Sequence, residues 1–176
     1  MTSTPDSPVE REAHARHGYS SLQIAFHWSI VVLVLVNWLI GDAMSDVFDA
    51  RVDGDFINQW GPAFVHIAIG LAIFGTMVAR LLARLKRPVK TAGDTKHPLL
   101  ARIGQLNHWA LYAVLLAMPP LGAIAWFAKS EAAGEIHSFL SAALIVLVLL
   151  HVGGAIVHLI LGENILRRIL RPTAGT

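Results

Sequence analysis

The sequence contains no cysteine, and few of its residues are charged. Without cysteine the chain cannot form a disulfide, a thiolate metal site, an iron–sulfur cluster or a covalently attached c-type haem. Only 15% of the 176 residues are Asp, Glu, Lys or Arg, whereas 55% are hydrophobic. This balance is too apolar for an ordinary water-soluble domain, so the long hydrophobic runs decide the fold class.

Four hydrophobic segments are each long enough to cross a bilayer, for which about 20 apolar residues are needed. They run over Leu22–Gly41, Trp60–Leu82, Leu106–Phe127 and Ile136–Leu161. The first run is too long for the core of a signal peptide, and we expect it to be retained. We therefore predict an all-α fold, an integral-membrane four-helix bundle over residues 21–172, with a polar N-terminal tail at 1–20 and a short C-terminal tail at 173–176.

The pI of about 9.3 reflects basic residues beside the spans rather than a nucleic-acid surface. Basic residues flank the start of the first span, the connection after the second and the end of the fourth: Arg11, Arg16, Arg84, Lys86, Arg87, Lys90, Lys96, Arg102, Arg167, Arg168 and Arg171. The two other connections are mainly acidic, with Asp42, Asp46, Asp49, Asp53 and Asp55 against Arg51, and Glu131 and Glu135 against Lys129. The positive-inside rule therefore places both termini and the 83–105 connection in the cytoplasm, and the partner of the protein is membrane lipid, with no nucleic acid.

Ionisable side chains inside spans are costly and usually functional, and here they are nearly all histidines. The histidines in or near the spans are His27, His66, His108, His137, His151 and His158. A single membrane histidine is more often a hydrogen-bonded helix contact, but three of these lie along one side of the fourth span. No Asp or Glu stands beside them at depth, as a proton relay or a metal transporter would require. Paired neutral imidazoles in an apolar bundle suit the two axial positions of a haem iron.

Depth in the membrane predicts how the histidines pair. His66 and His137 both lie near the outer face and would share one haem. His27 lies near the inner face, and its partner on the fourth span is His151 or His158. A site at His158 would place the two irons about 31 Å apart along the axis, nearly the hydrocarbon thickness, whereas His151 keeps them about 21 Å apart. We therefore predict His66–His137 and His27–His151 as ligands of two non-covalent b haems.

Small residues and prolines near these histidines predict the shape of the bundle. Gly70, Gly75, Gly153 and Gly154 would either admit a flat macrocycle between helices or allow two helices to pack closely. The stretch MPP at 118–120 predicts a kink in the third span. The third span would then contribute shape rather than iron ligands.

Four stretches resemble the bacterial cytochrome b561 family of four-helix, dihaem membrane proteins. They are YSSLQIAFHW at 19–28, HIAIGLAIFGTMVARLLARLKRP at 66–88, NHWALYAVLLAMPPLG at 107–122 and ENILRRILRP at 163–172, so the resemblance covers about residues 18–172. It implies a protein of the bacterial inner membrane with axial ligands at His27, His66, His137 and His151, the same four that depth selects. It also implies electron exchange with ubiquinone at the cytoplasmic side, where His158 matches a histidine close to that site.

His158 and Arg80 are the candidate quinone contacts. His158 lies seven residues beyond His151, about 10.5 Å further inward by helical rise. A neutral imidazole there can hydrogen-bond a quinone carbonyl and help to deliver a proton. Arg80 would stabilise the negative charge that develops on the quinone, or would pair with a haem propionate. The simpler alternatives are that His158 bonds a propionate or faces lipid head groups, and that Arg80 reaches towards head groups.

One branch of the family comprises superoxide oxidases, which pass electrons from superoxide at the outer face to quinone. The chain departs from that branch, because its third connection is very short, about Ala128–Glu135, and its outer connections are acidic and would repel an anion. We predict a quinone-linked transmembrane electron carrier whose periplasmic donor is superoxide or a redox protein. The alternatives are a haem-bearing anchor subunit for a docked dehydrogenase or hydrogenase, and a histidine-lined metal transporter.

Overall fold

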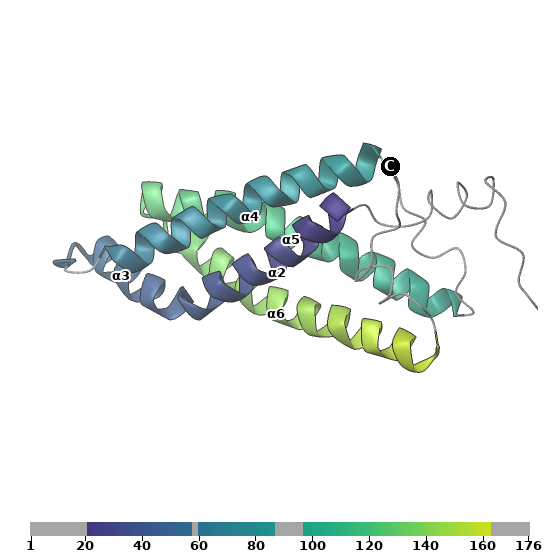
Figure 1. The fold of residues 1–176 in the computed structure, drawn as a ribbon. Coiled ribbons are helices and arrows are strands. Elements are labelled where there is room, and N and C mark those ends of the chain that lie inside the picture. The colour runs from purple at the N-terminus through teal and green to yellow at the C-terminus, as the bar shows by residue number, and fades with distance from the viewer. Residues whose placement is uncertain (1–20, 58–59, 87–96, 163–176) are drawn as a thin grey trace, which may run out of the picture.

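The computed structural model describes residues 21–57, 60–86 and 97–162, and the secondary structure of these residues is helical. The helices are α2 (Ser21–Leu39), α3 (Gly41–Asp53), α4 (Gly61–Lys86), α5 (Pro98–Ala128) and α6 (Glu131–Ile160). Of these, α2, α4, α5 and α6 are long and apolar enough to cross a membrane, and they run along one common long axis (Figure 1). The prediction of an all-α fold with four spans is confirmed. The predicted tails and the motif at 163–172 lie outside the described residues.

Three of the four spanning helices, α4, α5 and α6, extend beyond the hydrophobic runs that predicted them. Helix α5 begins at Pro98 rather than Leu106, and α4 continues to Lys86 rather than Leu82. Helix α6 begins at Glu131 rather than Ile136, because the Ser130 side chain accepts a hydrogen bond from the Ala133 N–H at 3.3 Å and caps the first turn. Each added stretch contains charged residues that interrupt the hydrophobic runs: Arg84 and Lys86 in α4, Arg102 in α5, and Glu131 and Glu135 in α6. Only Lys129 and Ser130 therefore separate α5 from α6.

The short helix α3 occupies the connection that the sequence predicted as an acidic loop. Met44, Val47 and Phe48 recur at the spacing of an amphipathic helix and pack against a cluster that includes Ala63 and Trp126. The four aspartates of α3 are exposed. The helix ends at Gly54, whose φ of +81° favours glycine. Its apolar face is too short to span a bilayer but sufficient to cover one end of the bundle.

The centre of the bundle is a hydrophobic cluster to which all four spans contribute. Its buried members are Ile30, Ile73, Met77, Tyr112, Leu115 and Leu144. Leu144 lies midway along α6 between His137 and His151, so this cluster separates two levels of histidines. Most other large hydrophobic side chains of the spans are exposed on the outside of the bundle, such as Leu35 and Leu149, where lipid would contact them.

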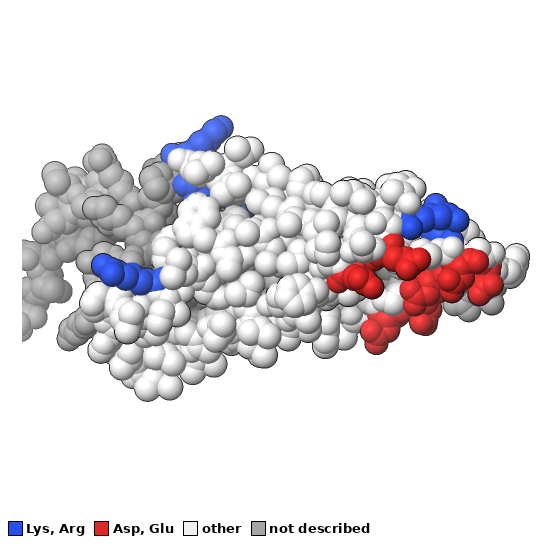
Figure 2. All heavy atoms as spheres, turned by 180° about the vertical axis from the view of Figure 1, so that it is seen from behind, with Lys and Arg blue, Asp and Glu red and all other residues white. Residues whose placement is uncertain are grey.

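The charged residues gather at the two ends of the bundle. Asp and Glu side chains lie at the end that carries α3 and the start of α6 (Figure 2). Lys and Arg side chains lie at the opposite end, where α4 ends at Lys86, and a smaller basic group that includes Arg51 lies among the acidic side chains. The long apolar surface between these ends has the form expected of a membrane-spanning bundle.

Candidate functional site

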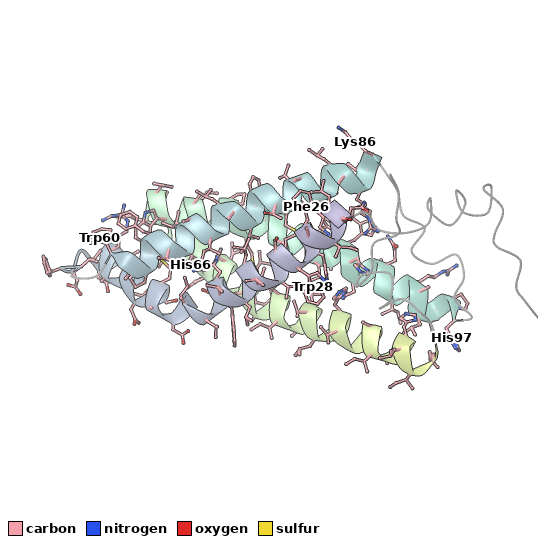
Figure 3. All side chains as sticks on the ribbon, viewed as in Figure 1. Phe26, Trp28, Trp60, His66, Lys86 and His97 are labelled. Carbon is pink, nitrogen blue, oxygen red and sulfur yellow. The ribbon has the colours of Figure 1, made fainter. Side chains whose placement is uncertain are left out.

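Two histidines from different helices face each other near the α3 end. The ring centres of His66 on α4 and His137 on α6 are 6.2 Å apart, with an angle of 64° between the ring planes. We call these two residues the outer pair, after the predicted orientation. Figure 3 shows His66 towards the end of the bundle marked by Trp60, whereas Lys86 and His97 mark the other end. The structure thus brings together the two residues that depth had paired.

Helix α5 orients the ring of His137. The His137 Nδ1 atom lies 3.0 Å from the backbone carbonyl oxygen of Met118. Because a carbonyl only accepts hydrogen bonds, Nδ1 must donate the proton, and Nε2 keeps its lone pair for another ligand. A Cβ atom at Gly122 would lie 3.2 Å from Cε1 and 3.3 Å from Nδ1 of His137. The stretch MPPLG at 118–122 therefore supplies an acceptor and the space for this ring.

The ring of His66, the partner of His137, is less completely hydrogen-bonded. It lies beside the backbone of Asn37 on α2, but its buried Nδ1 has no hydrogen-bond partner among the described residues. A buried ring nitrogen in this state is costly unless a ligand or a small shift satisfies it. The same holds for the Asn37 Oδ1 atom close by on α2.

A second pair of histidines lies at the level of the predicted cytoplasmic half. The ring centres of His27 on α2 and His151 on α6 are also 6.2 Å apart, at 60°; these two residues are the inner pair. A third ring, His108 on α5, lies 4.9 Å from His151 at 82°, and its Nδ1 is 2.7 Å from the Gly104 carbonyl oxygen. The sequence placed His108 near this level but assigned it no partner. His158 follows in the last turn of α6 and is half-buried.

Arg80 is held by uncharged groups next to the inner pair. Its Nε donates to the Tyr112 hydroxyl and its Nη1 to the Gln23 backbone carbonyl, both at 3.2 Å. It is close enough to His27 and His151 to interact with them electrostatically. Neither bonded partner neutralises the guanidinium, so an anionic group of a ligand would be stabilised here.

Aromatic residues of α5 complete this end of the site. The Arg84 guanidinium carbon lies 5.8 Å from the ring centres of both Trp109 and Tyr112, within the range of a cation–π interaction. Tyr112 is one helical turn beyond His108 and Arg84 one turn beyond Arg80. These i, i+4 repeats are a sequence signal that could have found the cluster, but our prediction of the site did not use them and Tyr112 was not predicted.

The spacing of both pairs fits an iron between the rings. Metal–imidazole bonds are about 2 Å long, and each nitrogen is roughly 1 Å from its ring centre, so opposed ligand rings have centres about 6 Å apart. The outer and inner pairs both meet this distance, whereas His108 and His151 at 4.9 Å do not. Within the described ranges no cluster of three or more His, Asp or Glu could hold a bare metal ion.

The glycines near the pairs face open space. A Cβ atom built at Gly70, Gly75, Gly153 or Gly154 would meet no other atom within 4 Å. Two of these, Gly70 and Gly154, lie about one helical turn from His66 and His151. The described structure therefore does not show these glycines in close helix–helix contacts, and the space beside the rings is compatible with a flat macrocycle.

Comparison with known proteins identifies the family. The sequence profile of the prokaryotic cytochrome b561 family matches residues 18–172. The chain belongs to this family. The resemblance that the motifs carried is confirmed, and the protein is a membrane cytochrome that transfers electrons and binds haem b.

Three relatives show how far the similarity extends. The chain is 31% identical over 159 residues to "Cytochrome b562" of Cereibacter sphaeroides, covering 88% of this chain and 96% of that protein. It is 27% identical over 104 residues to "Probable superoxide oxidase CybB" of Yersinia pestis, covering 59% and 55%. It is 24% identical over 183 residues to "Cytochrome b561 homolog 2" of Escherichia coli, covering 89% and 93%.

Proposed function

We propose that the protein carries electrons across the bacterial inner membrane through two non-covalent b haems, with both termini in the cytoplasm. His66 and His137 would hold one haem, and His27 and His151 the other. The observation that carries this proposal is the equal spacing of the two pairs, 6.2 Å between ring centres in each. When bound, the haems supply one-electron redox chemistry whose potential depends on ligands, hydrogen bonds and burial.

The residues of the chain bind, orient and insulate these sites. The Met118 carbonyl holds the His137 ring with Nε2 turned to its ligand position. The hydrophobic cluster around Leu144 keeps water and ions out of the region between the pairs. By helical rise the two histidines of α6 are about 21 Å apart, and each pair is therefore closest to one membrane face.

Ubiquinone is the proposed electron acceptor or donor at the predicted cytoplasmic end. His158 would hydrogen-bond a quinone carbonyl and help to deliver a proton. Arg80 would stabilise negative charge, either on the quinone as it is reduced or on a haem propionate. Its uncharged partners Tyr112 and Gln23 support this role, because they leave the positive charge available.

The electron donor at the other end is proposed as a periplasmic redox protein, with superoxide as the second candidate. The similarity to a protein named as a probable superoxide oxidase favours superoxide. The exposed aspartates of α3 oppose it, because they repel an anion. Arg51 offsets them only in part, because one guanidinium, held by the Trp126 carbonyl at 3.3 Å and the Trp126 ring at 4.7 Å, does not balance the four aspartates of α3.

Haem counting tests the proposal on the purified protein. Pyridine haemochrome analysis should give about two b haems per chain, and the variants His137→Ala and His151→Ala should each lose or alter a different low-spin component. His97→Ala, which changes a histidine outside both pairs, is the matched control and should keep both haems. If the His137 and His151 variants disturb the same spectral component, the proposed pairing is wrong.

A further inference from the structure

His108 contacts the inner pair in a geometry that an iron ligand opposite His151 could not have. The ring centres of His108 and His151 are 4.9 Å apart and their planes are nearly perpendicular, at 82°. We propose that His108 is a positioning residue: its Nε2 accepts a hydrogen bond from the Nδ1–H of His151, orients that ring and sets the redox potential of the inner haem. This inference rests on the proposed function of the inner pair.

The hydrogen-bonding state of His108 follows from its contact with its own helix. Its Nδ1 lies 2.7 Å from the Gly104 carbonyl oxygen, which can only accept, so Nδ1 carries the proton. In a neutral imidazole the other nitrogen, Nε2, then has a free lone pair and is an acceptor. A donor and an acceptor nitrogen about 3 Å apart, each roughly 1 Å from its ring centre, give a centre separation of about 5 Å, in agreement with the observed contact.

His151 needs such an acceptor if it binds iron. A histidine that ligates a metal through one ring nitrogen carries a proton on the other, and it nearly always donates that proton to a neighbouring group. Of the two histidine rings beside His151, that of His108 is nearer, at 4.9 Å between ring centres against 6.2 Å for His27. His108 therefore lies where the acceptor for the second ring nitrogen of His151 is expected.

The neighbouring residue keeps α5 and α6 in register at this level. The Asn107 side chain is buried, and its Nδ2 donates to the backbone carbonyl of Leu147 at 3.2 Å. Leu147 lies one helical turn before His151. Asn107 thus joins the turn of α5 that carries His108 to the turn of α6 that carries His151. The backbone positions of the two rings are therefore fixed relative to each other.

The outer and inner pairs would consequently differ in the group that accepts a hydrogen bond from the histidine of α6. His137 of the outer pair donates to a backbone carbonyl, whereas His151 would donate to an imidazole. An imidazole nitrogen is a stronger base than an amide oxygen, so it leaves more electron density on the ligand and stabilises the oxidised iron. Removing it should make the inner haem easier to reduce.

The test compares His108→Phe, which keeps a ring but removes the acceptor, with His108→Gln, which keeps an acceptor. Spectroscopic redox titration of the purified holoprotein should show two low-spin haems in both variants. In His108→Phe we expect the inner haem to have a roughly tenfold larger equilibrium constant for reduction, a midpoint shift of about +59 mV. The outer haem should not change and serves as the internal control. His108→Gln, whose amide oxygen is a weaker acceptor than an imidazole nitrogen, should raise the inner-haem potential by less than His108→Phe does.

Distinct outcomes would overturn the inference or the function beneath it. Unchanged potentials in His108→Phe, with two low-spin haems present, contradict only the role of His108. Loss of the inner low-spin signal in both variants while the outer signal remains would identify His108 as an iron ligand. That result would also overturn the inference that His108 only positions His151. If only His108→Phe loses the inner haem, the potential of the inner haem in His108→Gln decides. A rise of up to about 59 mV supports the acceptor role, and an unchanged, lower or still higher potential contradicts it. A protein that binds no haem, or that keeps the inner haem in His151→Ala, contradicts the proposed function itself.

Discussion

Neutral imidazoles suit an apolar bundle because they can bind a metal without placing a charged side chain in the membrane. A carboxylate at the same depth would be charged and costly, whereas histidine offers an uncharged ligand nitrogen and a second nitrogen for orientation. Arg80 is the exception, since it is a cation with the uncharged partners Tyr112 and Gln23. A cation with uncharged partners is expected where an anionic group binds. The half of the bundle that contains His158 would therefore favour an anionic ligand.

Replacing His158 by leucine should impair quinone reactivity without removing haem. We expect unchanged haem content and at least a tenfold slower reoxidation of the inner haem by a short-chain ubiquinone, a barrier increase of about 1.4 kcal/mol. The measurement is stopped-flow absorbance after reduction of the purified protein. Thr76→Val is a suitable control, because the Thr76 hydroxyl bonds the Ala72 carbonyl of its own helix at 2.7 Å. Wild-type reoxidation in His158→Leu would remove His158 from the quinone site, and loss of the inner haem would make it a ligand.

Among the helices, α5 supports both histidine pairs although the sequence predicted no iron ligand on it. It presents the Met118 carbonyl and the open side of Gly122 to His137, and the His108 ring to His151. Helix α3 has a different role, because its apolar face covers the outer end while its acidic face remains exposed. A helix without a proposed iron ligand can therefore decide how the proposed ligands of neighbouring helices are oriented.

Adding one methyl group at Gly122 should disturb the outer pair alone. The new Cβ would lie 3.2 Å from the His137 ring, so the ring must shift by a few tenths of an ångström and its bond to Met118 must weaken. Because changes to outer-shell partners typically lower metal affinity 10–100-fold, we expect Gly122→Ala to retain the outer haem about tenfold more weakly.

The matched control for this change is Gly104→Ala in the same helix. A Cβ at Gly104 would meet no atom within 4 Å, and the carbonyl that His108 contacts is unaffected. Haem retention during dilution, followed by the absorbance of each low-spin component, measures the effect. Equal retention of the outer haem in both variants would show that the space at Gly122 does not matter to His137.

At the scale of the whole molecule, charge and hydrophobicity define two ends and a lipid-facing surface. The acidic end carries α3 and the start of α6 (Figure 2), and the outer pair lies towards it. The opposite end is the one with Arg84 and Lys86, next to the inner pair. A charged substrate approaching the outer pair would therefore meet negative potential first, whereas the proposed quinone would reach the other end through lipid.

Salt dependence should reveal whether this acidic end repels superoxide. We expect superoxide to reduce the oxidised protein slowly at low ionic strength and faster as salt screens the aspartates. The variants Asp46→Asn and Asp49→Asn, which neutralise exposed side chains of α3, should raise the rate at low salt. Pulse radiolysis with detection of haem absorbance measures this rate. A rate close to the diffusion limit that falls as salt rises would show attractive steering and would make superoxide the favoured donor.

Several features of this protein were predictable from the sequence because they depend on local properties of the chain. Hydrophobic length predicted the four spans, and helical rise predicted the levels of His27, His66, His137 and His151 along them. The structure brings these four residues together in the predicted pairs. The helix ends were predicted less well, since charged residues such as Arg102 near the start of α5 interrupt the hydrophobic runs.

Other features depend on how the helices are rotated and shifted against one another, and only the tertiary structure decided them. The contacts of His108 with His151, of Tyr112 with Arg80, and of Gly122 with His137 each join two helices. Periodicity shows which residues share a face of one helix, but it does not say which residue of the next helix stands opposite. That choice is made by side-chain packing across the bundle and by single ties such as Asn107 to Leu147. The depth of these four histidines, and with it their pairing, was therefore readable from the sequence, but the groups of other helices that contact the rings were not.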